Sequence, residues 1–251
     1  MRRARLIALL GLTFLTLLGC SQVDDYWKRS VDLYHAYVSP TPDVDLSEAE
    51  LGEPIERKLA RLFAPVDSHV ESLRLFVSTR DEFPDDKWFA TLFERYPWIS
   101  GAAALDTKGQ ILDREPAVFA KSFAAEEVVS LSEDWEERRL LSYAENNAQG
   151  AEIYLAYPFY RDGVWQGLTV VHFDPAKVMA FSPDPQEVLL LAPGKILWPG
   201  RFDASQIPQN ADYWEAVLKD HDAGEIPTGG GFYWLARALG QSHLVYATSL
   251  R

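Results

Sequence analysis

One stretch, residues 152–174, constrains the fold of this chain more than any other. It reads EIYLAYPFYRDGVWQGLTVVHFD, two apolar segments joined at Asp162-Gly163. An Asp-Gly pair favours a type I′ turn because both residues tolerate a positive φ, so the stretch predicts an antiparallel hairpin. Both faces of its strands are largely apolar, so we expect them at the centre of a sheet that is covered on two sides. A two-residue turn predicts the pairs Tyr160–Trp165, Pro158–Gly167, Tyr157–Leu168 and Ile153–His172.

The start of the chain resembles a bacterial lipoprotein signal. Arg2, Arg3 and Arg5 precede an apolar run that is too short for a comfortable membrane span and that ends in Leu17-Leu18-Gly19-Cys20. The resemblance implies cleavage after Gly19 and a diacylglyceryl group on the Cys20 thiol; the alternative is an uncleaved membrane anchor or a cysteine that stands there by chance. Ser21 is compatible with transfer to the outer membrane. We therefore expect a lipid-anchored, periplasm-facing protein of the bacterial cell envelope, with the outer membrane favoured.

The acidic balance of the chain excludes two classes of partner. The sequence carries 24 Lys and Arg against 37 Asp and Glu, a net charge of −13, and loss of residues 1–19 removes three arginines and lowers it to −16. Such a surface repels nucleic acid and anionic lipid, so neither is expected to bind. Cys20 is the sole cysteine, which excludes an internal disulfide and a cysteine-ligated zinc site.

Two helices are predicted between residues 24 and 77. Residues 24–38 have apolar side chains at helical spacing and precede a proline-containing linker, which favours a short stalk helix; packing of this helix on the domain is equally compatible. A longer helix is predicted to start near Ser47, in a capping box, or at Pro54, and to be kinked by Pro65. Its apolar positions recur at three and four, as in a helix that lies on a core: Ile55, Leu59, Leu62, Phe63, Val66, Val70, Leu73 and Val77.

Two similar series of elements follow the long helix. After a short helix at 86–95, the first series is a strand, a turn at 106–109, a second strand, a helix that is capped by Ser132 and runs to about Tyr143, and the hairpin. The second series repeats a strand, glycine turn and strand from residue 186, then a helix at 210–219 and a hairpin around Gly240. This recurrence predicts two related sheet units on one helix.

The two series resemble the Cache family of extracytoplasmic, PAS-like sensor domains. The resemblance rests on strand residues and turn glycines at Pro97, Ile99, Gly101, Leu105, Asp106, Gly109, Ile111, Tyr157, Pro158, Asp162, Gly163 and Gly167. It implies an α+β fold in which a long N-terminal helix packs on two PAS-like antiparallel-sheet units. The implied boundaries are a signal peptide at 1–19, a lipid anchor, stalk helix and linker at 20–46, the long helix and first unit at 47–182, and a second, smaller unit at 183–251.

The resemblance also implies a small-molecule pocket in the first unit. The predicted register places Tyr157 and His172 on one face of the hairpin, where a phenol and an imidazole would orient a ligand; the alternative is that His172 is a core residue bonded to a backbone carbonyl. An amino acid bound in the usual way is not expected. The Arg-x-Trp-Tyr pattern is missing after Arg114, and GLTVVH at 167–172 stands where those members place an Asp. The candidate ligand-binding residues are Tyr157, His172, Tyr154 and Arg114.

No catalytic or metal-binding pattern is found. The five histidines are scattered outside HExxH-type motifs and no G-x-S-x-G elbow is present, so we expect no enzymatic activity, metal or cofactor. Arg237, in the second unit, is interpreted as a sheet-edge side chain that extends to solvent or, alternatively, as a ligand clamp. The expected function is small-molecule sensing, with a signal passed to an envelope or signalling partner. The alternative is an interaction or scaffold lipoprotein that keeps the fold and has no ligand.

Overall fold

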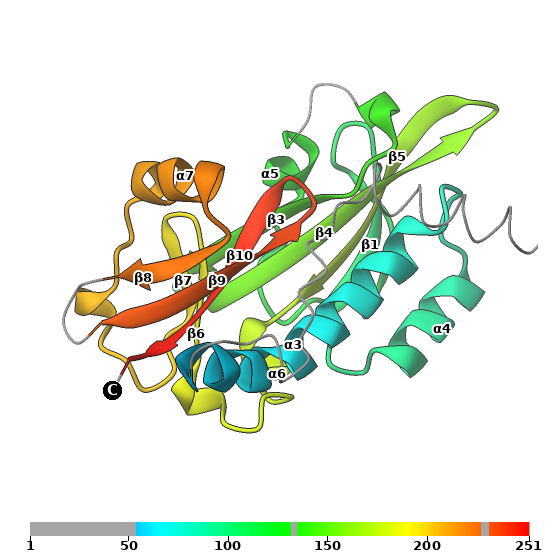
Figure 1. The fold of residues 1–251 in the computed structure, drawn as a ribbon. Coiled ribbons are helices and arrows are strands. Elements are labelled where there is room, and N and C mark those ends of the chain that lie inside the picture. The colour runs from blue at the N-terminus through cyan, green and yellow to red at the C-terminus, as the bar shows by residue number, and fades with distance from the viewer. Residues whose placement is uncertain (1–53, 132–134, 227–230, 251) are drawn as a thin grey trace, which may run out of the picture. The chain divides into compact units, whose positions relative to one another are not determined.

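The computed structural model describes residues 54–131, 135–226 and 231–250. The chain divides into two units, Met1–Asp45 and Leu46–Arg251, and all the described residues belong to the second. The predicted signal peptide, Cys20, the stalk helix and Ser47 lie outside the described residues. The described part contains one long helix, two five-stranded antiparallel sheets and several short helices (Figure 1), which confirms the predicted α+β fold class.

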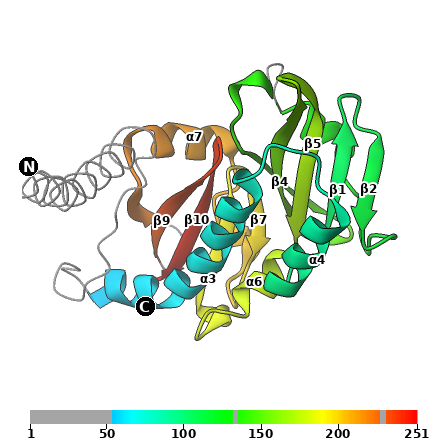
Figure 2. The same cartoon turned by 90° about the vertical axis from the view of Figure 1, so that its right-hand side faces the viewer.

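Helix α3, Pro54–Ser78, carries both sheets. It contacts strands β4 and β10 and other elements of both halves of the described chain. The helix continues through Pro65 and changes direction along its length (Figure 2), as expected where proline removes a backbone hydrogen bond. The side chains spaced at three and four are buried, as predicted: Leu59, Leu62, Phe63, Val66, Val70, Leu73 and Val77.

The first sheet has the strand order β2-β1-β5-β4-β3. Its strands are β1 Gly101–Asp106, β2 Ile111–Glu115, β3 Leu141–Asn147, β4 Gly150–Arg161 and β5 Val164–Phe173. Helix α4, Asp86–Arg95, precedes the sheet at the predicted residues and is capped by the Asp85 side chain. Two short helices, α5 at Ala125–Val129 and α6 at Pro175–Met179, follow β2 and β5. The hairpin strands β4 and β5 are interior strands of this sheet, as their two apolar faces predicted.

The second sheet repeats the first. Its order, β7-β6-β10-β9-β8, is the order of the first sheet with each strand number raised by five. Its strands are β6 Leu189–Ala192, β7 Lys195–Trp198, β8 Ala223–Ile226, β9 Phe232–Leu239 and β10 Ser242–Ser249, and helix α7 spans Ala211–Asp220. The predicted recurrence of strand, turn, strand, helix and hairpin therefore corresponds to two sheets with the same topology. The predicted boundary after residue 182 falls between α6 and β6.

The third strand of each sheet was not predicted. The helix expected from Ser132 to about Tyr143 is wrong at its end, because residues from Leu141 onward form β3 and pair along β4. Local sequence does not favour a strand there: the only β-branched or aromatic side chain in LSYAENN is Tyr143. Pairing with the long strand β4 decides the structure, and β8 likewise depends on β9.

The register of the β4–β5 hairpin differs from the prediction by one residue. Tyr160 faces Trp165 as expected, but a bulge follows, so that Phe159 faces Gly167 and Gln166 has no opposite residue. Gly167 permits the bulge because its backbone approaches β1: a Cβ at this position would lie 1.9 Å from the Leu105 carbonyl oxygen. Beyond the bulge every predicted pair is displaced, and one residue of displacement moves a side chain to the other face.

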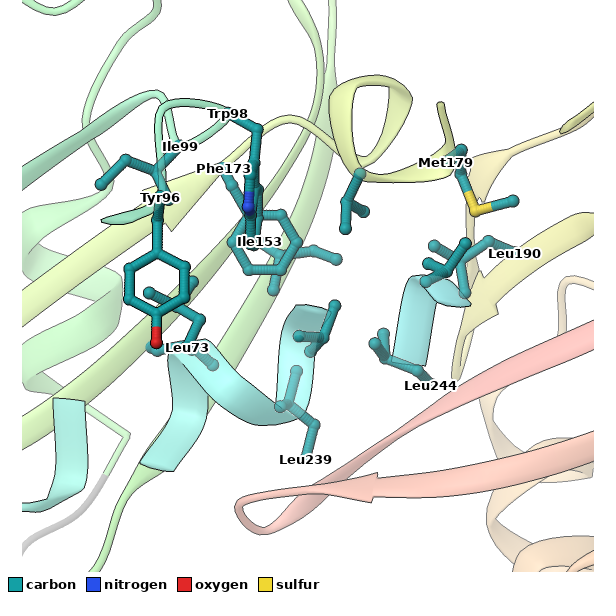
Figure 3. Close-up of a cluster of buried hydrophobic side chains, with 14 of the residues drawn as sticks. Leu73, Tyr96, Trp98, Ile99, Ile153, Phe173, Met179, Leu190, Leu239 and Leu244 are labelled. Carbon is teal, nitrogen blue, oxygen red and sulfur yellow. The ribbon is translucent and has the colours of Figure 1, made fainter. Parts of the chain in front are cut away.

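Three apolar clusters fill the layers on either side of the sheets. The main cluster joins α3 to one face of both sheets, and Figure 3 shows Leu73 of α3 near Ile153 and Phe173 of the first sheet, with Leu190 and Leu244 of the second. The opposite face of the first sheet is covered by α5 and its flanking segments, and that of the second by α7. The two sheets therefore share one core on the α3 side, and each has a separate core on the other side.

Candidate ligand-binding site

The structure separates the four predicted ligand-binding residues. The bulge pairs His172 with Tyr154 and Tyr157 with Thr169. Tyr154 belongs to the α5-side cluster, whereas Tyr157 packs partly buried against the α3-side cluster. The predicted pocket between Tyr157 and His172 is therefore wrong, because the two side chains lie on opposite faces of the sheet.

Tyr154, His172 and Arg114 are instead linked on the α5 side. The rings of Tyr154 and His172 are stacked with their centroids 5.4 Å apart. Arg114 is an exposed residue of edge strand β2, and its guanidinium lies 5.8 Å from the centroid of the Phe119 ring, which in turn contacts the His172 ring edge-on at 4.8 Å. Arg114 thus reaches the cluster through Phe119.

A buried polar cluster surrounds His172. The imidazole Nδ1 lies 2.8 Å from the Glu152 carboxylate, and these two residues are 1% and 0% exposed. The Lys121 ammonium lies 2.9 Å from the second Glu152 oxygen and 2.7 Å from Asp174, and it donates to the Ala151 carbonyl. Asp174 also caps α6 through the Ala176 amide. His172 is therefore buried, as predicted by the alternative in which it is a core residue. Its hydrogen-bond partner, however, is a carboxylate and not a backbone carbonyl.

Electrostatics keep Glu152 and Lys121 of this cluster charged. Burial raises the pKa of Glu152, but hydrogen bonds from His172, Ser100 and Lys121 outweigh it, and the net pKa lies below the usual value. Burial lowers the pKa of Lys121, but Asp174 and Glu152 raise it by more. An ionised carboxylate can only accept a hydrogen bond, so the proton between His172 and Glu152 is carried by Nδ1.

The segment 116–124, between β2 and α5, covers the cluster. Phe119 and Phe123 contact the His172 ring edge-on, and Lys121 between them forms the ion pairs. The far end of the segment is held by Ser122, whose backbone amide and hydroxyl both donate to the Gln149 side chain. Gly101 leaves room for the His172 and Phe119 rings, because a Cβ at this position would be 2.6 Å from both His172 Nε2 and the Phe119 ring. The segment is thus fixed by a few polar contacts and two aromatic rings.

Two features of this site point to recognition of a ligand. His172 Nε2 is buried and has no hydrogen-bond partner among the described residues. The Tyr154 hydroxyl donates to Glu145 at 2.8 Å, and burial followed by the Glu145 carboxylate raises its pKa, so it remains a phenol. His172 Nε2 is therefore open to a ligand, in a layer that also holds an ammonium, a carboxylate and a phenol that already have partners.

Three residues of the cluster, Glu152, Lys121 and Asp174, were not identified from the sequence. Glu152 and His172 stand within strands that are otherwise apolar, and a charged residue at such a position needs a partner. That signal could have identified Glu152. Lys121 and Asp174 carry no comparable signal, because they lie in loop and cap positions that are ordinarily solvated.

Two further predictions concern the rest of the described chain. Arg237 lies on β9, an interior strand, and its Nε bonds Asp67 of α3 at 3.0 Å, so its interpretation as a sheet-edge side chain is wrong.

Among the described residues, no group of His, Cys, Asp and Glu is arranged to hold a metal ion, and no helix is long and apolar enough to span a membrane.

Comparison with known proteins finds resemblance only among solved structures. No family model matches the chain, and no curated protein matches it. An extracellular ligand binding receptor from Desulfohalobium retbaense matches at 20% identity and TM-score 0.48, over 76% of this chain and 38% of the receptor. This chain thus spans well under half of that receptor.

Two chemoreceptor domains match over more of their own length. The ligand binding domain of the Pseudomonas aeruginosa chemoreceptor PctC, solved with GABA, is 14% identical, with TM-score 0.48 over 81% of this chain and 99% of that one. The corresponding domain of the Pseudomonas fluorescens chemoreceptor CtaA, solved with L-valine, is 13% identical, with TM-score 0.44 over 77% and 94%. These are receptors of the general class that the sequence resembles, and at such identities and TM-scores they do not assign the chain to a family.

Proposed function

We propose that this protein is a lipid-anchored, extracytoplasmic sensor that binds a small molecule on the α5 side of its first sheet and passes the signal to an envelope or signalling partner. Enzymatic activity is not part of the proposal. The observation that carries it is the buried His172 Nε2, which has no hydrogen-bond partner among the described residues. Leaving such an atom unpaired costs free energy, and a ligand that bonds it recovers that cost.

The covering segment supplies the route to this atom. Phe119 is only partly buried, and it separates His172 from exposed Arg114. Displacement of Phe119 would expose the imidazole edge while Lys121 still holds the segment to Glu152 and Asp174. A molecule bound there changes the position of segment 116–124, and this segment is the element through which binding would be communicated.

The test is a thermal-shift screen of small metabolites against three proteins. A ligand present at about 100-fold above its Kd is expected to raise the Tm of the wild type by about 5–10 °C. His172→Gln should abolish that shift, and His221→Gln, which changes an exposed histidine after α7, should preserve it. A ligand that shifts the wild type and His172→Gln equally would place the binding site elsewhere.

A second candidate function is an envelope scaffold without a ligand. The observation that favours it is that Phe119, Phe123 and Tyr154 all pack on the His172 ring, so this layer is already filled by side chains. A scaffold would show no stabilisation that depends on His172, whereas a sensor gains stability with its ligand only when His172 is present.

The lipid anchor is tested separately. Cys20→Ser removes the thiol that the lipid would modify, and several acyl chains contribute about 0.8 kcal/mol per buried CH₂ to membrane binding. We expect the Cys20→Ser protein in the soluble fraction, and the wild type in the membrane fraction with a processed N-terminus. A variant that stays in the membrane fraction would contradict the lipoprotein assignment.

A further inference from the structure

A cavity of about 540 Å³ lies where the first sheet meets the second. Strand β3 forms one wall with Tyr143 and Ala144, Pro193 of the β6–β7 turn and Lys195 at the start of β7 form another, and α7 contributes Leu218 and Lys219. The volume is in the range of small-molecule sites. The cavity lies outside the His172 cluster, and none of the four candidate residues from the sequence lines it.

The cavity is built on a fixed junction. The Gln241 side chain, in the β9–β10 turn, accepts from the Ser142 amide at 2.8 Å and donates to the Ser142 carbonyl at 2.9 Å, so that it pairs with β3 as a strand residue would. Gly240 lies so close that a Cβ would be 2.7 Å from the Leu140 carbonyl oxygen. Asn146, further along β3, donates to the Ile196 carbonyl of β7. These bonds hold the walls in place without a ligand, which lowers the entropy cost of binding.

The charge of the cavity is opposite to that of the chain. The lining contains two lysines, Lys195 and Lys219, one carboxylate, Glu215, and His243, whereas the whole chain has a net charge of −13. Neither lysine forms an ion pair with a carboxylate of the described residues. Glu145, the acidic residue next to this wall on β3, accepts a hydrogen bond from Tyr154.

Lys195 is the residue that an anion would stabilise most. Its ammonium lies 4.7 Å from the centroid of the Tyr143 ring and donates to the Ala144 carbonyl. Burial lowers the pKa of Lys195, and Glu145 opposes this only in part. An ammonium that is partly desolvated and lacks a carboxylate partner gains more from an incoming anion than a solvated one does.

We propose that this junction cavity binds a small organic anion, held through its carboxylate by Lys195 and Lys219 and through its carbon skeleton by the apolar wall. That wall consists of Tyr143, Ala144, Pro193 and Leu218. Because the ligand would touch β3 of the first sheet and α7 of the second unit together, its binding stabilises the junction.

Calorimetric titration with acetate, succinate and citrate tests the proposal on the full chain at a constant ionic strength of about 0.15 M. At least one carboxylate should bind saturably, while succinamide, the uncharged analogue of succinate, and inorganic sulfate should not. Lys195→Met should weaken binding about tenfold or more, and Lys219→Gln should weaken it several-fold, because each removes a charge-assisted bond.

Two control variants show whether the anion binds at this cavity. Lys177→Gln removes an exposed lysine from the last turn of α6, as Lys219→Gln does from α7, and should leave the Kd unchanged. Lys108→Gln, at an exposed lysine in the turn between β1 and β2, should also leave it unchanged. Absence of saturable binding by all three carboxylates, equal binding of sulfate or succinamide, or an unchanged Kd in folded Lys195→Met and Lys219→Gln would overturn the proposal.

Discussion

Replacing Lys121 with Met tests the buried cluster, because it removes the ammonium and keeps an unbranched side chain. The ammonium bonds Glu152 at 2.9 Å and Asp174 and the Ala151 carbonyl at 2.7 Å each. Loss of one partner from a buried ion pair costs about 3–5 kcal/mol, since a charge is left uncompensated. Lys121 is 19% exposed, and Glu152 keeps His172. We therefore expect Lys121→Met to lower the free energy of unfolding by about 2–3 kcal/mol.

Urea unfolding at neutral pH measures this loss as a shift in midpoint at unchanged m-value. The control is Lys177→Met, which makes the same chemical change at an exposed position of α6 and should alter the free energy of unfolding by no more than about 0.5 kcal/mol. A loss in Lys121→Met no larger than in this control would refute the inference that the cluster is a coupled, buried set of charges.

The loss should depend on pH in a defined direction. The folded-state pKa of Glu152 is lowered, so its contribution to stability is present above the unfolded pKa and is lost as pH falls through the lowered value. The pKa of Lys121 is raised, so its contribution is complete below its unfolded pKa and is lost as pH rises through the folded value. The difference in free energy of unfolding between wild type and Lys121→Met should therefore be largest at pH values between the ordinary pKa values of Glu and Lys, and it should shrink in acid. An equal difference at neutral and acid pH would contradict this assignment.

Two further pairs of variants test the fold. Gly167→Ala should lower the free energy of unfolding by about 3 kcal/mol or more, because its Cβ would lie 1.9 Å from the Leu105 carbonyl oxygen. Gly163→Ala has open space around it and a φ of 79°, so it should lower the free energy of unfolding by only about 1–2 kcal/mol. Urea unfolding compares the two variants, and equal losses would argue against the bulge. Trp214→Ala should lower the free energy of unfolding by about 3–5 kcal/mol, because the indole is 1% exposed in the core between α7 and the second sheet. Tyr213→Ala changes a side chain that is 37% exposed and should lower it by less than about 1 kcal/mol. Thermal unfolding compares the two variants, and a small loss in Trp214→Ala would mean that α7 does not cover the core of the second sheet.

The sequence predicted the elements whose signals are local. The spacing of Leu59 to Val77 predicted α3, and Asp162-Gly163 located the turn of the central hairpin. It did not predict β3, whose strand structure depends on its pairing with β4. Of the candidate site, His172 and Tyr154 were identified and do meet, but Tyr157 was placed on the wrong face by the unrecognised bulge.

By itself, the sequence determined the class of fold, the recurrence of its strand, turn and hairpin segments, and the apolar faces of the long helix and hairpin, because periodicity and turn chemistry act over a few residues. Tertiary structure alone decided which side chains meet. The bulge at Gln166 depends on the approach of Gly167 to β1, and the cluster joins Lys121, Glu152, His172 and Asp174 from separate segments. These contacts arise from strand pairing and burial between residues far apart in the chain, and no local pattern encodes them.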